Sequence, residues 1–90
     1  MSGILAFVDI LVDTKQMDSA VASLKQLPNM KEVYQVVGGG CNIVSIVAAS
    51  DIDEFRDVLK NKIMKINGVR EIITSLSLAN HKSLSADHYQ

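Results

Sequence analysis

The chain has 90 residues, which is enough for one domain with one modest hydrophobic core. Hydrophobic residues make up 48% of it, with no Trp and only two Phe and two Tyr, so its apolar surface is mostly aliphatic and exceeds what one small core needs. Nine cations balance ten anions without a basic block, which argues against direct binding to nucleic acid.

Composition also bears on cellular location. The single cysteine, Cys41, cannot form a disulfide within the chain and fits a reducing cytoplasm. The first residues have no basic region before an apolar run, so we expect no signal peptide. No apolar stretch approaches the roughly 20 residues of a spanning helix, and we expect a cytoplasmic protein without membrane contact.

The first half of the chain predicts a strand, a helix and a second strand. Residues 4–12 are almost all apolar and are interrupted only by Asp9, which is typical of a strand buried on both faces. A helix is expected over residues 14–26, because apolar side chains recur there at helical spacing before Pro28. Residues 30–37 form the next expected strand, at a sheet edge because charged residues begin it.

The second half repeats this order. Three glycines at residues 38–40 turn the chain into an apolar strand over residues 41–49. Asp51 and Glu54 have the spacing of a capping box, and Gly68 ends the helix that they begin. The apolar stripe expected on this helix consists of Ile52, Phe55, Leu59, Ile63 and Ile66.

The last expected strand covers residues 69–78, with Ile72, Thr74, Leu76 and Leu78 on one face and Ile73, Ser75 and Ser77 on the other. Residues 79–90 are polar and aperiodic, and we expect them to form a flexible C-terminal tail after a domain at residues 1–78.

The two halves also match residue by residue. Lys31 and Glu32 correspond to Arg70 and Glu71 at an offset of 70 − 31 = 39 positions. Two strand–helix–strand units joined by a glycine turn predict an α+β, ferredoxin-like βαββαβ fold, with a four-stranded antiparallel sheet and both helices on one face. The other face would be bare and hydrophobic, which predicts a homodimer formed sheet to sheet.

Catalytic and metal sites have little support in the sequence. Cys41 is better explained as a small hydrophobic residue than as a nucleophile, because no His precedes His81 to act as its base. His81, His88 and Asp87 match no standard spacing of metal ligands. We therefore expect no catalytic residue, no metal and no cofactor.

A small-molecule site has better candidates. Gly38, Gly39 and Gly40 lack the Lys and the following helix of a phosphate-binding loop, and either a tight turn or a notch for a ligand explains them.

The polar residues after the glycines have two interpretations. Asn42, Thr74 and Ser75 offer amide and hydroxyl groups that suit an amino acid, although ordinary sheet-surface polarity explains them more simply. Asp9 is either a carboxylate for a ligand or an interface, or a residue satisfied near its strand end.

The order of these motifs resembles the RAM domain, the amino-acid-sensing regulatory domain of the Lrp/AsnC transcription regulators. The likeness runs from Ile4 to Leu78 and is carried by residues 13–14, 27–33, 39–44, 66–71 and 74–78. It implies sheet-to-sheet dimers, rings of dimers, and an amino-acid effector bound between dimers at the positions of Gly39, Asn42, Thr74 and Ser75.

The chain departs from the family pattern in three ways. An acidic residue of the family is Asn42 here, and an aromatic residue before it is Cys41. Family regulators carry a helix-turn-helix domain before the RAM domain, whereas only three residues precede Ile4, so the chain resembles the stand-alone versions.

These features predict a non-catalytic module that senses a small metabolite and forms homo-oligomers, and that either modulates a paralogous Lrp/AsnC regulator or acts as a free sensor. The alternative is a structural or chaperone-like module that binds a peptide along a sheet edge. A small enzyme of the dimeric ferredoxin-like barrel type is disfavoured, since such enzymes usually need a His in a cleft.

Overall fold

The computed structural model describes residues 3–37 and 40–79, without the side chains of Thr74 and residues 76–79. Its elements, in chain order, are β1 (Ile4–Val12), a 3-10 turn (Thr14–Gln16), α1 (Met17–Lys25), β2 (Met30–Gln35), β3 (Ile43–Ala49), α2 (Ile52–Asp57), the π-helical segment η2 (Val58–Ile63) and β4 (Val69–Ala79).

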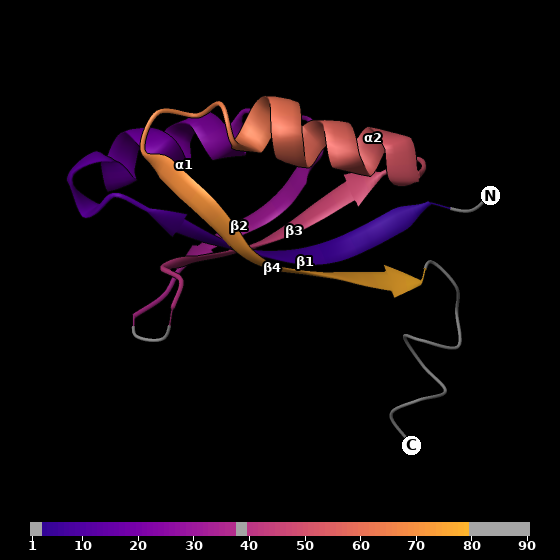
Figure 1. Cartoon of the computed structure of the whole chain (residues 1–90), viewed down its shortest axis with the longest axis horizontal. Helices are drawn as coiled ribbons and strands as arrows, with labels where there is room; N and C mark the ends of the chain where they lie inside the picture. Colours follow the sequence, from indigo (N-terminus) through magenta and orange to yellow (C-terminus); the bar gives the residue numbers. More distant parts are fainter. Residues whose placement is uncertain (1–2, 38–39, 80–90) are drawn as a thin grey trace, which may run out of the picture.

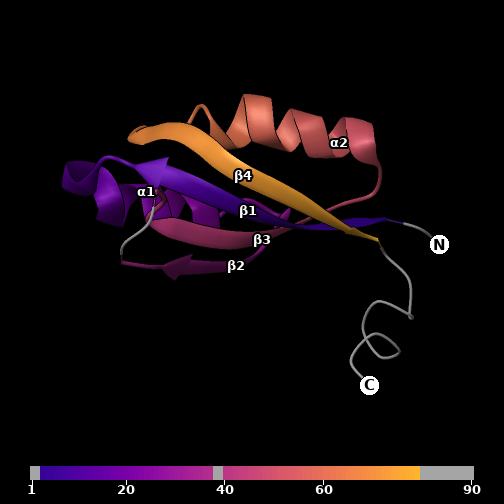
Figure 2. The ribbon, with the colours of Figure 1, turned by 60° about the horizontal axis from the view of Figure 1, so that its bottom comes forward.

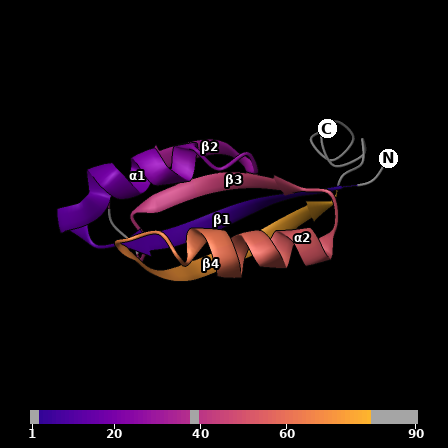
Figure 3. The same ribbon diagram turned by 90° about the horizontal axis from the view of Figure 1, so that it is seen from above.

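The four strands form one sheet in the order β2-β3-β1-β4, and every neighbouring pair is antiparallel. This order confirms that the two apolar strands are central and that β2 lies at an edge. Figure 1 shows both helices on the same side of the sheet, and Figure 3 shows α1 and α2 lying side by side across it. The fold is the ferredoxin-like α+β arrangement predicted from the repeat.

The structure bears out the 39-residue repeat at the strand starts. β1 begins at Ile4 and β3 at Ile43, and β2 begins at Met30 and β4 at Val69, so both differences, 43 − 4 and 69 − 30, equal 39. The two halves are therefore equivalent at the points where the chain enters the sheet.

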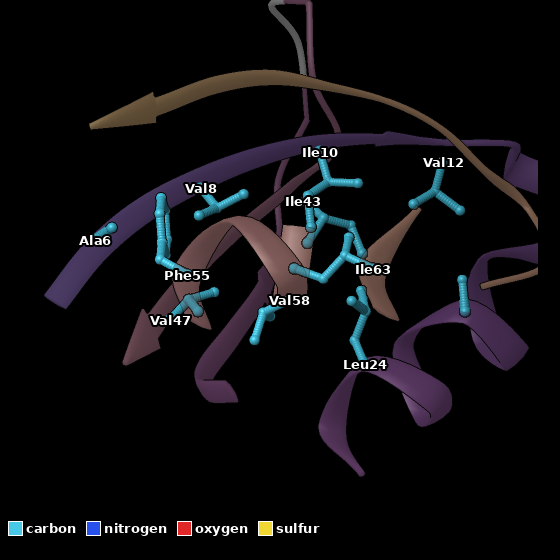
Figure 4. Close-up of a cluster of buried hydrophobic side chains, with 11 residues drawn as sticks. Ala6, Val8, Ile10, Val12, Leu24, Ile43, Val47, Phe55, Val58 and Ile63 are labelled. Carbon is cyan, nitrogen blue, oxygen red and sulfur yellow. The ribbon is translucent and has the colours of Figure 1, made fainter. Parts of the chain in front are cut away.

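The core lies between the sheet and the helices. Alternate residues of β1 and β3 point toward the helices, and Figure 4 shows them meeting side chains from α1, α2 and η2. The buried hydrophobic residues are Ala6, Val8, Ile10, Val12, Ala20, Leu24, Ile43, Val47, Phe55, Val58 and Ile63.

The apolar stripe expected on the second helix is only partly correct. Phe55 and Ile63 are buried, but Ile52 is 47% exposed, and Val58, which the stripe omitted, is fully buried. Ile52 is the first residue of α2, at the end of the helix, and Val58 follows the buried Phe55 by three residues on the same face. The π-helical segment begins at Val58, and the backbone N–H of Met64 donates there to the carbonyl of Leu59 five residues earlier. This wider turn places Val58 and Ile63, which are five residues apart, on the same buried face.

The start of the second helix confirms the predicted cap, except that the Glu54 carboxylate binds Ser50 rather than the backbone N–H of Asp51. The Asp51 side chain accepts a hydrogen bond of 2.8 Å from the Glu54 backbone N–H. The Glu54 carboxylate reaches the N–H and hydroxyl of Ser50, at 2.6 and 2.7 Å, and also accepts from Asn29. The hydrogen bonds from Ser50 and then the one from Asn29 lower the pKa of Glu54 to about 2.

Gly68 ends this region as expected. Its φ of 99° lies in the left-handed region, and a Cβ added there would lie 2.8 Å from Cβ of Gln16. The Gly68 carbonyl accepts from the backbone N–H of Asp13, so the tight approach joins the two halves of the chain.

Two strands are shorter than predicted. β2 ends at Gln35 rather than at residue 37, and β3 begins at Ile43 rather than at residue 41. Beyond the ends of these two strands, the backbone N–H of Val36 still donates to the carbonyl of Asn42 at 3.0 Å.

The register confirms the predicted alternation of the last strand from Thr74 onward, but the face predicted for Ile72 is wrong because β4 contains an irregularity. Ile72 pairs with Ile10, which is buried under the helices, whereas Thr74 pairs with Asp9, the next residue of β1. Ile72 and Thr74 therefore do not share a face as simple alternation predicted, and Ile73 is the extra residue between them. Apart from Ala79, which ends β4, the expected tail lies outside the described residues.

The face of the sheet away from the helices is uncovered within the described chain, and Figure 2 shows the strands from this side. We call it the open face and define it by the outward residues of the central strands: Leu5, Phe7, Asp9 and Leu11 of β1, and Val44, Ile46 and Ala48 of β3. Leu5 and Phe7 are 38% and 40% exposed, as expected for a hydrophobic face without a cover.

Candidate functional site

The predicted site residues lie around the second half of β1. Asn42 directly precedes β3 on one side, where its backbone N–H donates to the carbonyl of Ile10 at 3.1 Å. Thr74 lies in β4 on the other side and pairs with Asp9. Two strand spacings, about 10 Å, separate the backbones of Asn42 and Thr74, a span that one amino-acid ligand can bridge.

The Asn42 side chain is already bound to the fold. Its Oδ1 accepts from the backbone N–H of Val12 at 2.8 Å, and its Nδ2 donates to the Val12 carbonyl at 2.7 Å. The Asn42 side-chain amide thus pairs with the Val12 backbone as a residue of a neighbouring strand would. It holds the start of β3 beside the end of β1. Sequence reasoning assigned Asn42 to a ligand and missed this contact, which depends on a residue 30 positions away.

Thr74 and Ser75 are consecutive, but their partners in β1 differ. Ser75 pairs with Val8, which is buried under the helices, while Thr74 pairs with Asp9 on the open face. Ser75 is itself exposed. The structure therefore pairs Thr74, rather than Ser75, with Asp9 on the open face.

Of the predicted glycine site, Gly38 and Gly39 lie outside the described residues. Gly40 is exposed, and a Cβ added to it would meet nothing within 4 Å. Gly40 thus has open space beside it, and no close approach of the described chain requires a glycine there.

Cys41 is only partly buried and lies before β3, so the expected role of a buried hydrophobic residue holds in part. Among residues 3–37 and 40–79, no three His, Cys, Asp or Glu side chains gather as metal ligands. His81, Asp87 and His88 lie outside the described residues. The described helices are also too short to cross a membrane.

A surface depression of about 240 Å³ lies at the outer edge of β2, away from these residues. Residues from the end of α1 and from β2 line it: Lys25, Met30, Lys31, Glu32 and Val33. Sequence reasoning did not find it, since only the packing of α1 against β2 brings Lys25 beside Lys31.

Comparison with known proteins gives a family match. The family model for the Lrp/AsnC ligand binding domain matches residues 5–86. No curated protein matches the chain.

Solved structures share the fold. TTHA0845 from Thermus thermophilus is 28% identical with a TM-score of 0.71, and the match covers 88% of this chain and 94% of that one. AsnC from E. coli is 30% identical with a TM-score of 0.69, and this chain spans 51% of its length. The regulator NMB0573 from Neisseria meningitidis, solved in complex with L-Met, has a TM-score of 0.72 over 90% of this chain and 51% of its own, but its 14% identity supports the fold alone.

Proposed function

Because this chain belongs to the Lrp/AsnC ligand-binding domain family, we propose that it is a non-catalytic module that senses a small metabolite and forms oligomers. The observation that carries the proposal is the family match over residues 5–86, which is nearly the whole chain. We propose an amino acid as the effector, since the neighbour from Neisseria meningitidis was solved with L-Met. A paralogous Lrp/AsnC regulator is the proposed partner.

The proposed site lies between Asn42 and Thr74, beside the glycine turn. Asn42 positions the turn through its two hydrogen bonds to Val12. The backbone N–H groups of Gly38, Gly39 and Gly40 would then bind the effector carboxylate. Such N–H donors suit a carboxylate, because a hydrogen bond to a charged acceptor is stronger than one between two neutral groups. The Thr74 hydroxyl, about 10 Å away across β1, would bind the other end of the effector, whereas Ser75 pairs with Val8 on the opposite face.

Assembly through the open face completes the proposal. An exposed hydrophobic sheet face finds its best cover in a second sheet about 10 Å away, which gives a homodimer. Rings of such dimers would place the glycine turns near a neighbour. An effector then shifts the assembly only if it binds one assembled form more tightly than another.

A panel of the twenty amino acids tests the proposal on the full chain by thermal unfolding and light scattering. A ligand at 100 times its Kd should stabilise the fold by about 2.7 kcal/mol and raise its Tm. Thr74→Ala should weaken this shift, whereas Ser23→Ala, an exposed change on α1, should not. If no amino acid changes Tm or particle size, the sensing role is wrong.

The alternative of a peptide-binding sheet edge has less support. β2 is the edge strand beside the depression, but its pairing with β3 shifts between Met30 and Glu32 and it carries Lys31 there. A bulge and a lysine are the devices by which proteins block an edge against further strands.

A further inference from the structure

Asp9 is the one charged residue among the open-face positions of the two central strands. The other outward positions of β1 and β3 are hydrophobic, and Asp9 lies among them, paired with Val44. Its partner on the other side is Thr74, whose side chain is outside the described part. Any cover laid on the exposed Leu5 and Phe7 would also reach this carboxylate, because all three lie along one strand.

The size of the open face suits a second copy of the chain. β1 has nine residues, or about 30 Å of strand, and four strands at about 4.8 Å span about 19 Å. The product, about 600 Å² per copy, is at the low end of stable protein interfaces. Two identical twisted sheets also pack face to face without a change of shape. A dimer with an interface of this size is only marginally stable, so the cost of burying one charge strongly affects its Kd.

The groups around Asp9 make the face anionic. β3 brings no titratable side chain to the open face, since its outward residues are Val44, Ile46 and Ala48. β4 brings Glu71, opposite Leu11, and β2 brings Glu32 and Tyr34. The Tyr34 hydroxyl donates to the Glu32 carboxylate, which raises the pKa of Tyr34.

The nearby cations are directed elsewhere. Lys31 lines the edge depression with Lys25, and the Arg70 guanidinium lies 3.5 Å from the Asp13 carboxylate. In the described registers, no Lys, Arg or His pairs across the open face. Among residues 3–37 and 40–79, the open face of a second copy would therefore bring further carboxylates and no paired Lys, Arg or His.

We propose that Asp9 sets the strength of sheet-to-sheet association between two copies of this chain. Its carboxylate opposes the dimer, because burial of an unpaired carboxylate is costly. A neutral side chain of similar size at this position would let the dimer tighten. This inference rests on the proposed assembly through the open face and adds the residue that regulates it.

Sedimentation velocity of the full chain and of its Asp9→Asn variant, at one pH and one ionic strength, tests the inference. Asp9→Asn should lower the dimer Kd by about tenfold, because it removes the buried charge and keeps the size of the side chain. Asp9→Ser serves as a second neutral variant, and circular dichroism confirms that both fold.

A matched control separates Asp9 from general charge effects. Asp18→Asn removes an exposed carboxylate from α1, on the side of the sheet away from the open face, and should leave the dimer Kd unchanged. If Asp9→Asn dimerises no more tightly than the original chain, the inference is wrong while the proposed assembly stands. If neither protein dimerises, the proposed assembly itself fails.

Discussion

The Asn42→Ala variant should have a lower free energy of unfolding than the original chain, even when no effector is present. The substitution removes hydrogen bonds of 2.8 and 2.7 Å to the backbone N–H and carbonyl of Val12. Val12 is 1% exposed, so water cannot easily replace the lost partners. A backbone group left without a partner costs about 1–3 kcal/mol, and we expect a loss of about 2–6 kcal/mol for the pair.

Urea denaturation followed by circular dichroism measures this loss, with a fall in Tm on the order of 10 °C as a second readout. Asn61→Ala is the matched control, because its amide donates to Asp57 on the exposed surface of the helix. The control should change stability by less than about 0.5 kcal/mol. Equal stability of the two variants would refute the structural role assigned to Asn42.

Three further predictions concern the core, the helix cap and the turns. Because the pKa of Glu54 is lowered to about 2, its contribution to stability should be full above about pH 5 and should disappear toward pH 2. Glu54→Gln should flatten that part of a stability–pH curve, and an unchanged curve would contradict the assignment. Ile63→Ala should cost about 2–5 kcal/mol in urea denaturation, whereas Ile52→Ala should cost less than about 1 kcal/mol, since only Ile63 is buried. Equal costs would contradict this difference in burial. Gly68→Ala should lower Tm because of its positive φ, whereas Gly40→Ala, with open space beside it, should leave Tm nearly unchanged.

The candidate site was less predictable than the fold. Residue types alone marked Asn42, Thr74 and Asp9, and the sheet places all three around the second half of β1. The sequence could not indicate that the Asn42 amide is bound to Val12, because this contact joins residues that only the sheet brings together. It also could not find the depression beside Lys25, which depends on helix packing.

The topology of this protein follows from local signals in its sequence. Repeated classes of residue at an offset of 39 positions, apolar runs and turn residues were sufficient for the order of strands and the side on which the helices pack. The buried face of the second helix, which includes Val58 and leaves Ile52 exposed, and the face of Ile72 in β4, where Ile73 interrupts the alternation, emerged only from the packed structure. The π turn and the bulge each insert one residue into a regular element. Local periodicity cannot predict them, because they are set by the fit of each element against its neighbours.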